Sequence, residues 1–148
     1  RVCVMGGCNA RGLSRGDIGT VDIVVMDVSF ISQALLYPAV CDILREGGDF
    51  ISLIKPQFEV GREHIGGGGI VRDRRAREAA VLHLLETAVD FGLAARSLIR
   101  SAIEGGDGNI EYLALFTAAG SAQKLPDGWE RRIKEVSGED KKCCTDSE

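Results

Sequence analysis

Runs of apolar residues bounded by glycine, proline or charged residues recur along the chain and predict five strands. Four of them cover residues 21–26, 49–54, 95–99 and 111–117, and the first opens the chain at residues 1–5. Apolar runs of roughly four to eight residues between such breakers are typical of buried strands. The run 49–54 follows Gly47-Gly48 and stops at Lys55-Pro56, so we expect a central strand that delivers a lysine to the sheet edge.

Two stretches between these strands have apolar residues at helical spacing. The first covers residues 32–45, with Gly47-Gly48 as its expected stop. It contains Pro38, so this helix is either kinked or begins at the proline. The second runs from Asp73, a residue type that favours helix N-caps, to Gly92. Alternating strands and helices imply parallel pairing, and the predicted fold class is therefore α/β, with a Rossmann-like sheet.

We expect the chain to divide at residue 118. Residues 1–118 hold every predicted strand, whereas residues 119–148 are polar and charged apart from Trp129. The second part is expected to be a loosely held or disordered tail, or a fragment of helix. Because the chain starts without methionine and inside an apolar run, we also expect it to be a piece of a longer protein, cut inside a domain.

Composition narrows the function classes only a little. The 148 residues are 45% hydrophobic and 27% charged, as in globular domains, and the net charge of −4 supplies no global basic field. No apolar run reaches the ~18 residues that span a bilayer, and no secretory signal is visible, so no membrane partner is expected. The five cysteines match no zinc or disulfide spacing, and we interpret them as reduced thiols of a cytoplasmic protein without a metal site.

Three charged residues are predicted to meet at one edge of the sheet. Asp27 follows the strand 21–26, Lys55 follows the strand 49–54, and Glu111 opens the last strand. Ligands of open α/β sheets lie beyond the carboxyl ends of the strands, and an antiparallel last strand would start at that same edge. Each residue alone could be structural, as a helix cap, an ion-pair partner or a turn acid. Together they suggest a cleft in which a lysine handles protons between carboxylates.

The long connection between residues 56 and 72 contains Gly66–Gly69 and is either a functional lid or disordered. A phosphate-binding loop is not supported, because no lysine-serine or lysine-threonine pair follows the glycines. A basic cluster in and after this connection either follows a nucleic-acid backbone or is a solvated helix entrance. Its members are Arg62, His64, Arg72, Arg74, Arg75 and Arg77. The remaining histidine, His83, is expected on a helix surface or in packing.

Four segments resemble a known family in order and spacing. They are "DIVVMDVSFIS" (22–32), "LREGGDFISLIKPQFEVGRE" (44–63), "GGGIVRD" (67–73) and "GNIEYLAL" (108–115), and "NAR" (9–11) fits as well. The chain resembles the TlyA family, also known as hemolysin A, within the FtsJ-like ribosomal RNA methyltransferases. The resemblance covers residues 1–116, and the pair "DVSFIS" and "KPQFEVGRE" is its most specific part.

The resemblance implies methylation of ribose 2′-hydroxyls in ribosomal RNA with S-adenosyl-L-methionine as cofactor. The family's sheet is mostly parallel with an antiparallel last strand. Its catalytic lysine–aspartate–lysine–glutamate tetrad matches Asp27, Lys55 and Glu111 by motif, while the first lysine has no counterpart here. Cofactor contacts are expected from Asn9, Asp27, Val28, Ser29 and Phe30, and RNA contacts from Arg62, Arg72, Arg74 and Arg75.

The family's sheet has strands that this chain lacks. Its strands 1 and 2 carry the glycine-rich cofactor loop, and an S4-type RNA-binding domain normally precedes them. Strand 4 of that sheet, residues 21–26 here, would then present a bare apolar edge. We therefore expect the chain alone to be an incomplete enzyme.

Two rival functions remain to be weighed. A non-catalytic RNA-binding or assembly module would need no aspartate–lysine–glutamate set, and a pore-forming toxin has no spanning helix or barrel pattern to support it. The target nucleotide and the oligomeric state are left open by the sequence.

Overall fold

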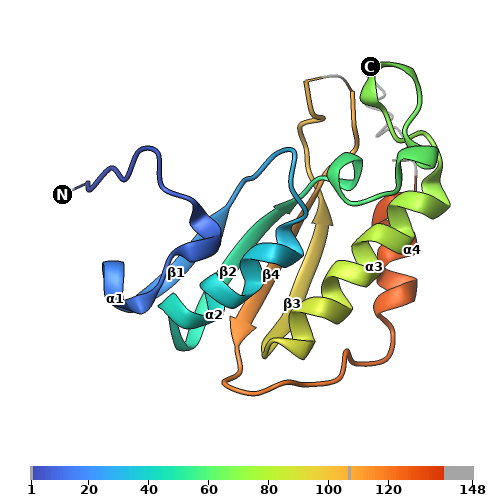
Figure 1. Ribbon diagram of the computed structural model, residues 1–148. Helices are drawn as coiled ribbons and strands as arrows, with labels where there is room; N and C mark the ends of the chain where they lie inside the picture. The colour runs from blue at the N-terminus through green and yellow to red at the C-terminus, as the bar shows by residue number, and fades with distance from the viewer. Residues whose placement is uncertain (1, 107, 139–148) are drawn as a thin grey trace, which may run out of the picture.

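The computed structural model describes residues 2–106 and 108–138, which form one sheet with helices packed on it. The strands are β1 (Val21–Met26), β2 (Leu44–Ile54), β3 (Leu93–Arg100) and β4 (Tyr112–Ala118). The helices are α1 (Arg15–Ile18), α2 (Tyr37–Ile43), α3 (Arg74–Asp90) and α4 (Trp129–Ser137), and Figure 1 shows their arrangement. Short 3-10 turns cover Ala10–Gly12, Gln33–Leu36, Pro56–Phe58, Arg62–His64 and Gly67–Gly69.

The strand order is β1-β2-β4-β3, and β4 is the strand that runs against the others. β1 pairs with β2 in parallel, whereas β4 pairs antiparallel with both β2 and β3. This confirms the predicted α/β class and the mostly parallel sheet with an antiparallel last strand. The carboxyl ends of β1 and β2 and the start of β4 consequently lie at the same edge.

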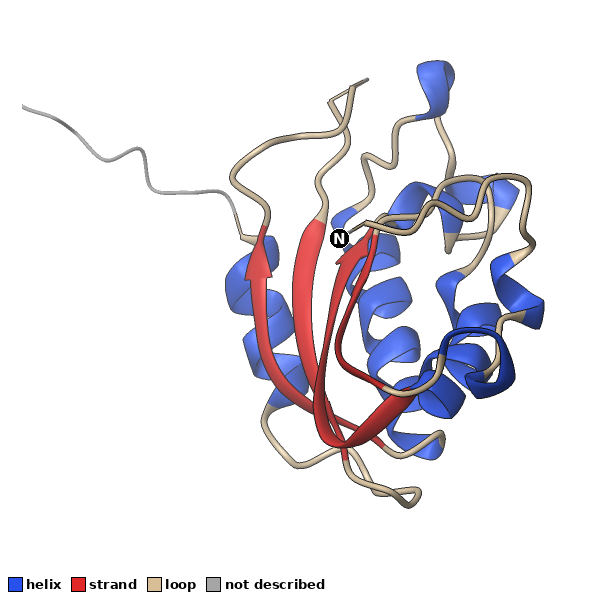
Figure 2. Ribbon diagram, turned by 90° about the vertical axis from the view of Figure 1, so that its left-hand side faces the viewer, coloured by secondary structure: helices blue, strands red, loops and turns tan. Residues whose placement is uncertain are grey.

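The core lies between one face of the sheet and helices α2 and α3. Phe50 and Ile54 of β2 are buried and share this core with Tyr37 of α2 and Leu84 of α3. The ring of Tyr37 meets that of Phe50 edge-on, with centroids 6.1 Å apart, and Phe50 stacks on Phe116 of β4 at 5.4 Å. Figure 2 shows helices on both sides of the sheet. These contacts hold β2 rigidly in place, and its end is where Lys55 emerges.

The region beyond residue 118 contributes a packed helix. Ile133 of α4 is buried in the hydrophobic core, and the helix packs against α3 and β3. The expected tail thus contains a helix that is firmly attached, and residues 139–148 lie outside the described residues. The domain boundary at residue 118 remains a prediction. Within the described residues, no helix combines the length and hydrophobicity needed to cross a membrane.

The first predicted strand and the first predicted helix differ in the structure. Residues 2–5 form no strand and are exposed, so the strand predicted at 1–5 is wrong for every described residue of it. An extended segment needs a neighbouring strand for its backbone hydrogen bonds, and none of the four strands pairs with it. The helix predicted over 32–45 is shorter, because a 3-10 turn precedes it and Pro38 lies in the first turn of α2. Of the two alternatives for Pro38, the structure selects a helix that begins near the proline.

β2 begins at Leu44, five positions before the predicted strand 49–54, because the glycines that were expected to stop a helix form an irregularity within the strand. The register with β1 shifts between Val21 and Ile23, and Gly47 has φ +73°. A Cβ on Gly48 would lie 2.8 Å from the Asp22 carbonyl oxygen, so only glycine fits this close approach. The second predicted helix is confirmed: α3 is capped by Asp73, whose side chain accepts from the Arg75 N–H at 2.8 Å.

Candidate active site

Lys55 and Asp27 are in direct contact at the carboxyl edge of the sheet. The Lys55 Nζ lies 2.6 Å from Asp27 Oδ1, and it donates to the Ser29 hydroxyl at 3.3 Å. Because β1 and β2 are adjacent and parallel, the residues that follow them emerge side by side. The Lys55 side chain is only 15% exposed, whereas that of Asp27 is 62% exposed. The lysine is therefore mostly covered, while the carboxylate that it contacts is open to solvent.

Glu111 reaches the same edge from the antiparallel strand. Ile54 pairs with Tyr112 in the sheet register, so Lys55 and Glu111 each lie one residue beyond that pair. The Glu111 carboxylate is buried and accepts a hydrogen bond from Gln57 Nε2 at 2.9 Å. A Cβ on Gly105 would come within 2.7 Å of Glu111 Oε1, so the preceding turn folds closely over the carboxylate. All three predicted catalytic residues therefore meet at one edge, and their catalytic roles remain a prediction.

A buried polar network that the sequence did not reveal supports this edge. Glu59 Oε1 accepts from the Gln33 backbone N–H at 2.9 Å, and the Ser52 hydroxyl donates to Gln33 Oε1. Burial raises the pKa of Glu59, while hydrogen bonds from Ser32 and Gln33 and the charge of His83 act in the opposite direction. Ser52, a polar residue within the apolar run 50–54, was the one signal in the sequence that could have pointed to this network.

The predicted cofactor residues are spread over two surfaces. Asp27 and Val28 line a hollow of about 230 Å³ between β1, α2 and residues 10–13. Ser29 instead faces Lys55, and Phe30 is 90% exposed, with its ring centroid 4.8 Å from that of Phe58. Asn9 uses its side chain to cap the adjoining 3-10 turn, accepting from the Arg11 N–H at 3.1 Å. The hollow is mainly apolar, with the Asp27 carboxylate at its edge.

The predicted basic cluster separates into exposed and engaged arginines. Arg62, Arg72 and Arg75 are exposed. Arg74 pairs with Glu78 at 2.7 Å and donates to the Lys134 carbonyl at 3.1 Å, so it links α3 to α4. Arg77 is buried and donates to the carbonyls of Val71 and Arg72 at 2.8 and 3.0 Å. Arg74 and Arg77 of the cluster thus bond to other parts of the protein, whereas Arg62, Arg72 and Arg75 are exposed.

The glycine-containing connection is fastened to the turn that precedes Glu111. The buried Asn109 accepts from the Val71 N–H through Oδ1 at 3.0 Å and donates to the Gly69 carbonyl through Nδ2 at 3.0 Å. The disordered alternative for residues 56–72 is therefore wrong, since three 3-10 turns and these bonds order the connection. The sequence offered no signal for this contact beyond the asparagine itself.

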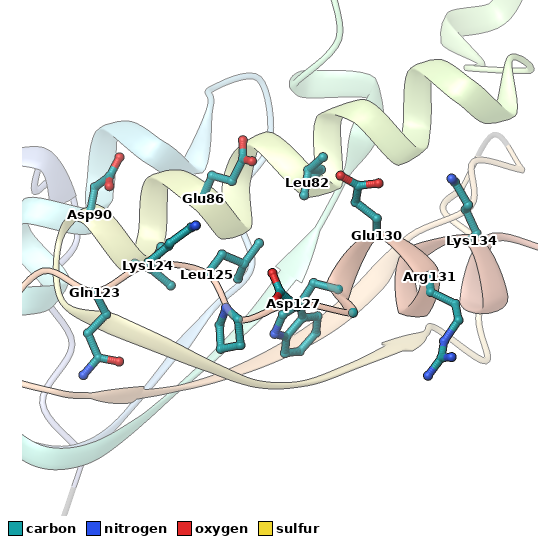
Figure 3. Close-up of a pocket in the computed structure, with 14 residues that line it drawn as sticks. Leu82, Glu86, Asp90, Gln123, Lys124, Leu125, Asp127, Glu130, Arg131 and Lys134 are labelled. Carbon is teal, nitrogen blue, oxygen red and sulfur yellow. The ribbon is translucent and has the colours of Figure 1, made fainter.

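A larger hollow lies elsewhere and contains none of the predicted site residues. It is an open groove of about 940 Å³ between α3 and the segment that leads into α4. Figure 3 shows acidic side chains along it, including Glu86 and Asp90, opposite basic ones that include Lys124 and Lys134. Charges of both signs on exposed helices are ordinary surface, so we place the candidate active site at the sheet edge.

Known proteins resemble this chain in sequence over most of its length. Residues 1–117 match the model of the FtsJ-like methyltransferase family. The chain is 39% identical over 140 residues to the 16S/23S rRNA (cytidine-2′-O)-methyltransferase TlyA of Mycobacterium tuberculosis, covering 91% of this chain and 52% of that protein. It is 37% identical to YqxC of Bacillus subtilis, a candidate rRNA methyltransferase, covering 92% of this chain and 49% of that protein. The chain therefore spans about half the length of these curated relatives.

Solved structures show the same fold. A hemolysin candidate from Lactococcus lactis superimposes with a TM-score of 0.82 at 37% identity, over 93% of this chain and 65% of that one. Another from Streptococcus thermophilus gives 0.80 at 41% identity, over 88% and 46%. The fibrillarin pre-rRNA processing protein of Methanococcus jannaschii, at 17% identity and a TM-score of 0.51, shares the fold alone. The match of residues 1–117 places this chain in the FtsJ-like methyltransferase family, and its sequence and fold resemble those of the TlyA and hemolysin proteins.

Proposed function

We propose that the protein to which this chain belongs transfers a methyl group from S-adenosyl-L-methionine to a ribose 2′-hydroxyl of ribosomal RNA. The observation that carries the proposal is the contact between Lys55 and Asp27, with Glu111 brought to the same edge by the reversal of β4. The relatives named as rRNA (cytidine-2′-O)-methyltransferases support the RNA substrate. A ribosomal substrate also agrees with the expected cytoplasmic location.

The residues at the edge suit a reaction that depends on positioning. A ribose hydroxyl is a weak nucleophile, and holding it in line with the methyl group supplies much of the acceleration. Lys55 Nζ, oriented by Asp27 and Ser29, binds the hydroxyl oxygen and in its unprotonated form takes the hydroxyl proton as the new bond forms. Asp27 then balances the charge of the lysine ammonium, and Glu111, held by the hydrogen bond from Gln57, supplies a second carboxyl group at this edge.

The hollow beside Asp27 fits one wall of a cofactor site. Its volume of about 230 Å³ is below the ~300 Å³ at which pockets for drug-sized ligands begin, so it holds a part of such a ligand. Val28, Leu36 and Val40 give it apolar walls suited to an aromatic ring, and Asp27 offers a carboxylate for a hydroxyl or a cationic group. S-adenosyl-L-methionine, when bound, supplies the electrophilic methyl group.

Exposed arginines in the connection that follows Lys55 and in the first turn of α3 are the proposed contacts to RNA phosphates. Arg62, Arg72 and Arg75 face outward, and Arg72 is held in place by the bond from Arg77 to its carbonyl. Phosphate contacts give affinity that falls as salt rises. Arg74 is the weakest of the proposed RNA contacts, because its guanidinium group is already paired with Glu78.

Replacement of Lys55 by alanine tests the proposal. In the complete gene product, Lys55→Ala is expected to lower transfer of tritiated methyl groups to ribosomal RNA by at least about 100-fold, because the hydroxyl loses its positioning group. The circular dichroism spectrum and cofactor binding should change little, because Lys55 follows β2 and belongs neither to the hydrophobic core nor to the lining of the hollow beside Asp27. Near-normal turnover would contradict the catalytic role, and RNA binding by a wild-type protein without methyl transfer would favour the non-catalytic module.

A further inference from the structure

Residues 27–33, which follow β1, contact residues 55–59, which follow β2, at both ends of the two segments. At the start, Asp27 contacts Lys55. At the far end, Glu59 accepts from the Gln33 N–H at 2.9 Å, and Ser32 also hydrogen-bonds its carboxylate. The two segments, residues 27–33 and 55–59, therefore form one cross-linked unit although they are distant in the sequence.

Gln33 is also hydrogen-bonded to the sheet through its side chain. Its side chain is buried, and Gln33 Oε1 accepts from the hydroxyl of Ser52 in β2. In the sheet register Ser52 pairs with Met26, the last residue of β1. Gln33 is thus fixed to the sheet through its side chain and to Glu59 through its backbone, and the chain between Met26 and Gln33 has little freedom.

The chain between these anchors is conformationally strained. Phe30 has φ +63°, and it is the one non-glycine residue with positive φ among the described residues. L-residues rarely adopt this conformation, and it persists only where the surroundings impose it. The ring of Phe30 leans on that of Phe58, and this exposed contact alone is a weak constraint. The firm restraint lies at the ends of the segment, where Glu59 acts.

We propose that Glu59 is a positioning residue for the methyl transfer, which holds Asp27 and Ser29 in register with Lys55 by accepting the Gln33 N–H. The inference rests on the proposed function and adds a residue to it. Glu59 does not touch the reacting atoms; it acts through the segment 27–33. If the acceptor is lost, the strained turn at Phe30 can relax, and the two oxygen atoms that orient Lys55 Nζ move with it.

Three variants of the complete gene product test whether the length of the side chain at position 59 or its charge is what matters. Glu59→Ala removes the acceptor, Glu59→Asp keeps the charge but is one methylene too short to reach Gln33, and Glu59→Gln keeps an oxygen at the right distance without the charge. Misplacement of catalytic groups by about 1 Å lowers rates by about 100-fold. We expect kcat to fall by about that factor in Glu59→Ala and Glu59→Asp, with KM for RNA unchanged within about threefold. Glu59→Gln is expected to restore kcat to within about threefold of the wild type.

A matched control is Glu86→Ala, which removes an exposed glutamate from α3 and should leave kcat unchanged. Thermal unfolding is measured on every variant, and Glu59→Asp provides the decision if Glu59→Ala does not fold. Amide hydrogen exchange of residues 29–35 adds a readout that does not depend on turnover, and it should be faster in Glu59→Ala and Glu59→Asp but not in Glu59→Gln.

The outcomes are distinct. Wild-type kcat in a folded Glu59→Asp protein, or unchanged exchange at residues 29–35, overturns the role of Glu59 while leaving the proposed function intact. A Glu59→Gln protein as slow as Glu59→Ala means that charge matters rather than reach, which also overturns it. A wild-type protein that transfers no methyl group to ribosomal RNA overturns the proposed function, and the role of Glu59 in that reaction falls with it.

Discussion

At the β3 edge of the sheet, α4 packs against the strand, and Arg132 donates from Nε and Nη2 to the Leu98 carbonyl at 3.2 and 3.0 Å. At the β1 edge, the strand pairs only with β2 within the part of the chain that the structure describes, and Ile23 and Val25 are 59% and 72% exposed. The closed edge belongs to the half of the sheet that lacks the candidate site. The open edge borders Asp27 and the hollow beside it, so the part of the fold nearest the proposed chemistry is the edge strand whose apolar side chains are exposed.

The difference shows two ways of dealing with an edge strand. Unpaired strand edges invite pairing with other chains, and proteins cover or charge them. α4 and Arg132 cover β3 with residues from this chain. β1 has no such cover among the described residues, and the expectation that a further strand pairs with it stays a prediction.

The largest expected effect is at the closed edge. Ile133→Ala removes the buried side chain by which α4 holds to the core, and deletion of such a side chain costs about 2–5 kcal/mol. Urea unfolding followed by circular dichroism should show a loss in this range. Ile103→Ala, at a side chain that is exposed, is the matched control and should change the unfolding free energy by less than about 0.5 kcal/mol. A loss as small in Ile133→Ala would mean that α4 does not secure this edge.

A smaller effect is expected on the open side, from the titration of Glu59. Burial raises the pKa of this carboxyl in the folded chain above its unfolded value of about 4.3. Its contribution to stability is therefore complete below that pH and is lost as pH rises through the folded-state pKa. Protonated Glu59 costs no buried charge, and glutamine resembles it in shape, so the Glu59→Gln protein should lack this pH dependence.

The measurement is the difference in unfolding free energy between the wild type and Glu59→Gln from pH 4 upward. Because both proteins share every other titrating group, the difference in unfolding free energy reports the titration of Glu59 together with its coupling to Tyr37 and His83, which interact with this carboxyl. The wild type should lose stability relative to the variant as pH rises. A difference that is constant with pH, or that moves in the opposite direction, would show that burial does not dominate at Glu59.

The smallest effect on stability, within about 0.5 kcal/mol, is expected from Val25→Lys at the open edge. A charge on an exposed edge strand discourages pairing with another chain. Light scattering at increasing protein concentration should show less self-association in Val25→Lys than in the wild type. Ile99→Lys on β3, where α4 covers the edge, is the matched control and should associate as the wild type does. Equal self-association of the two variants would show that the β1 edge is no more open to pairing than the β3 edge.

The sequence by itself predicted the elements with strong local signals. Asp73 and the apolar face that follows it predicted α3, and the runs ending at Met26 and Ile54 predicted β1 and most of β2. The meeting of Asp27 with Lys55 followed from one rule, that adjacent parallel strands release their next residues at the same edge. These features depend on hydrophobic periodicity and strand direction, which a sequence carries directly.

Only the tertiary structure decided which side chains hold that edge together. The bonds of Glu59 to Gln33, Gln57 to Glu111 and Asn109 to Val71 join residues 26, 54 and 38 positions apart. No local pattern specifies such pairs, because they depend on where the backbone places buried donors and acceptors that must find partners. The same holds for Gly47-Gly48, which resembled a helix stop in the sequence and lies within β2 because β1 runs beside it at close approach. Local periodicity thus determined the elements, and the burial of polar groups between them determined the arrangement of the candidate site.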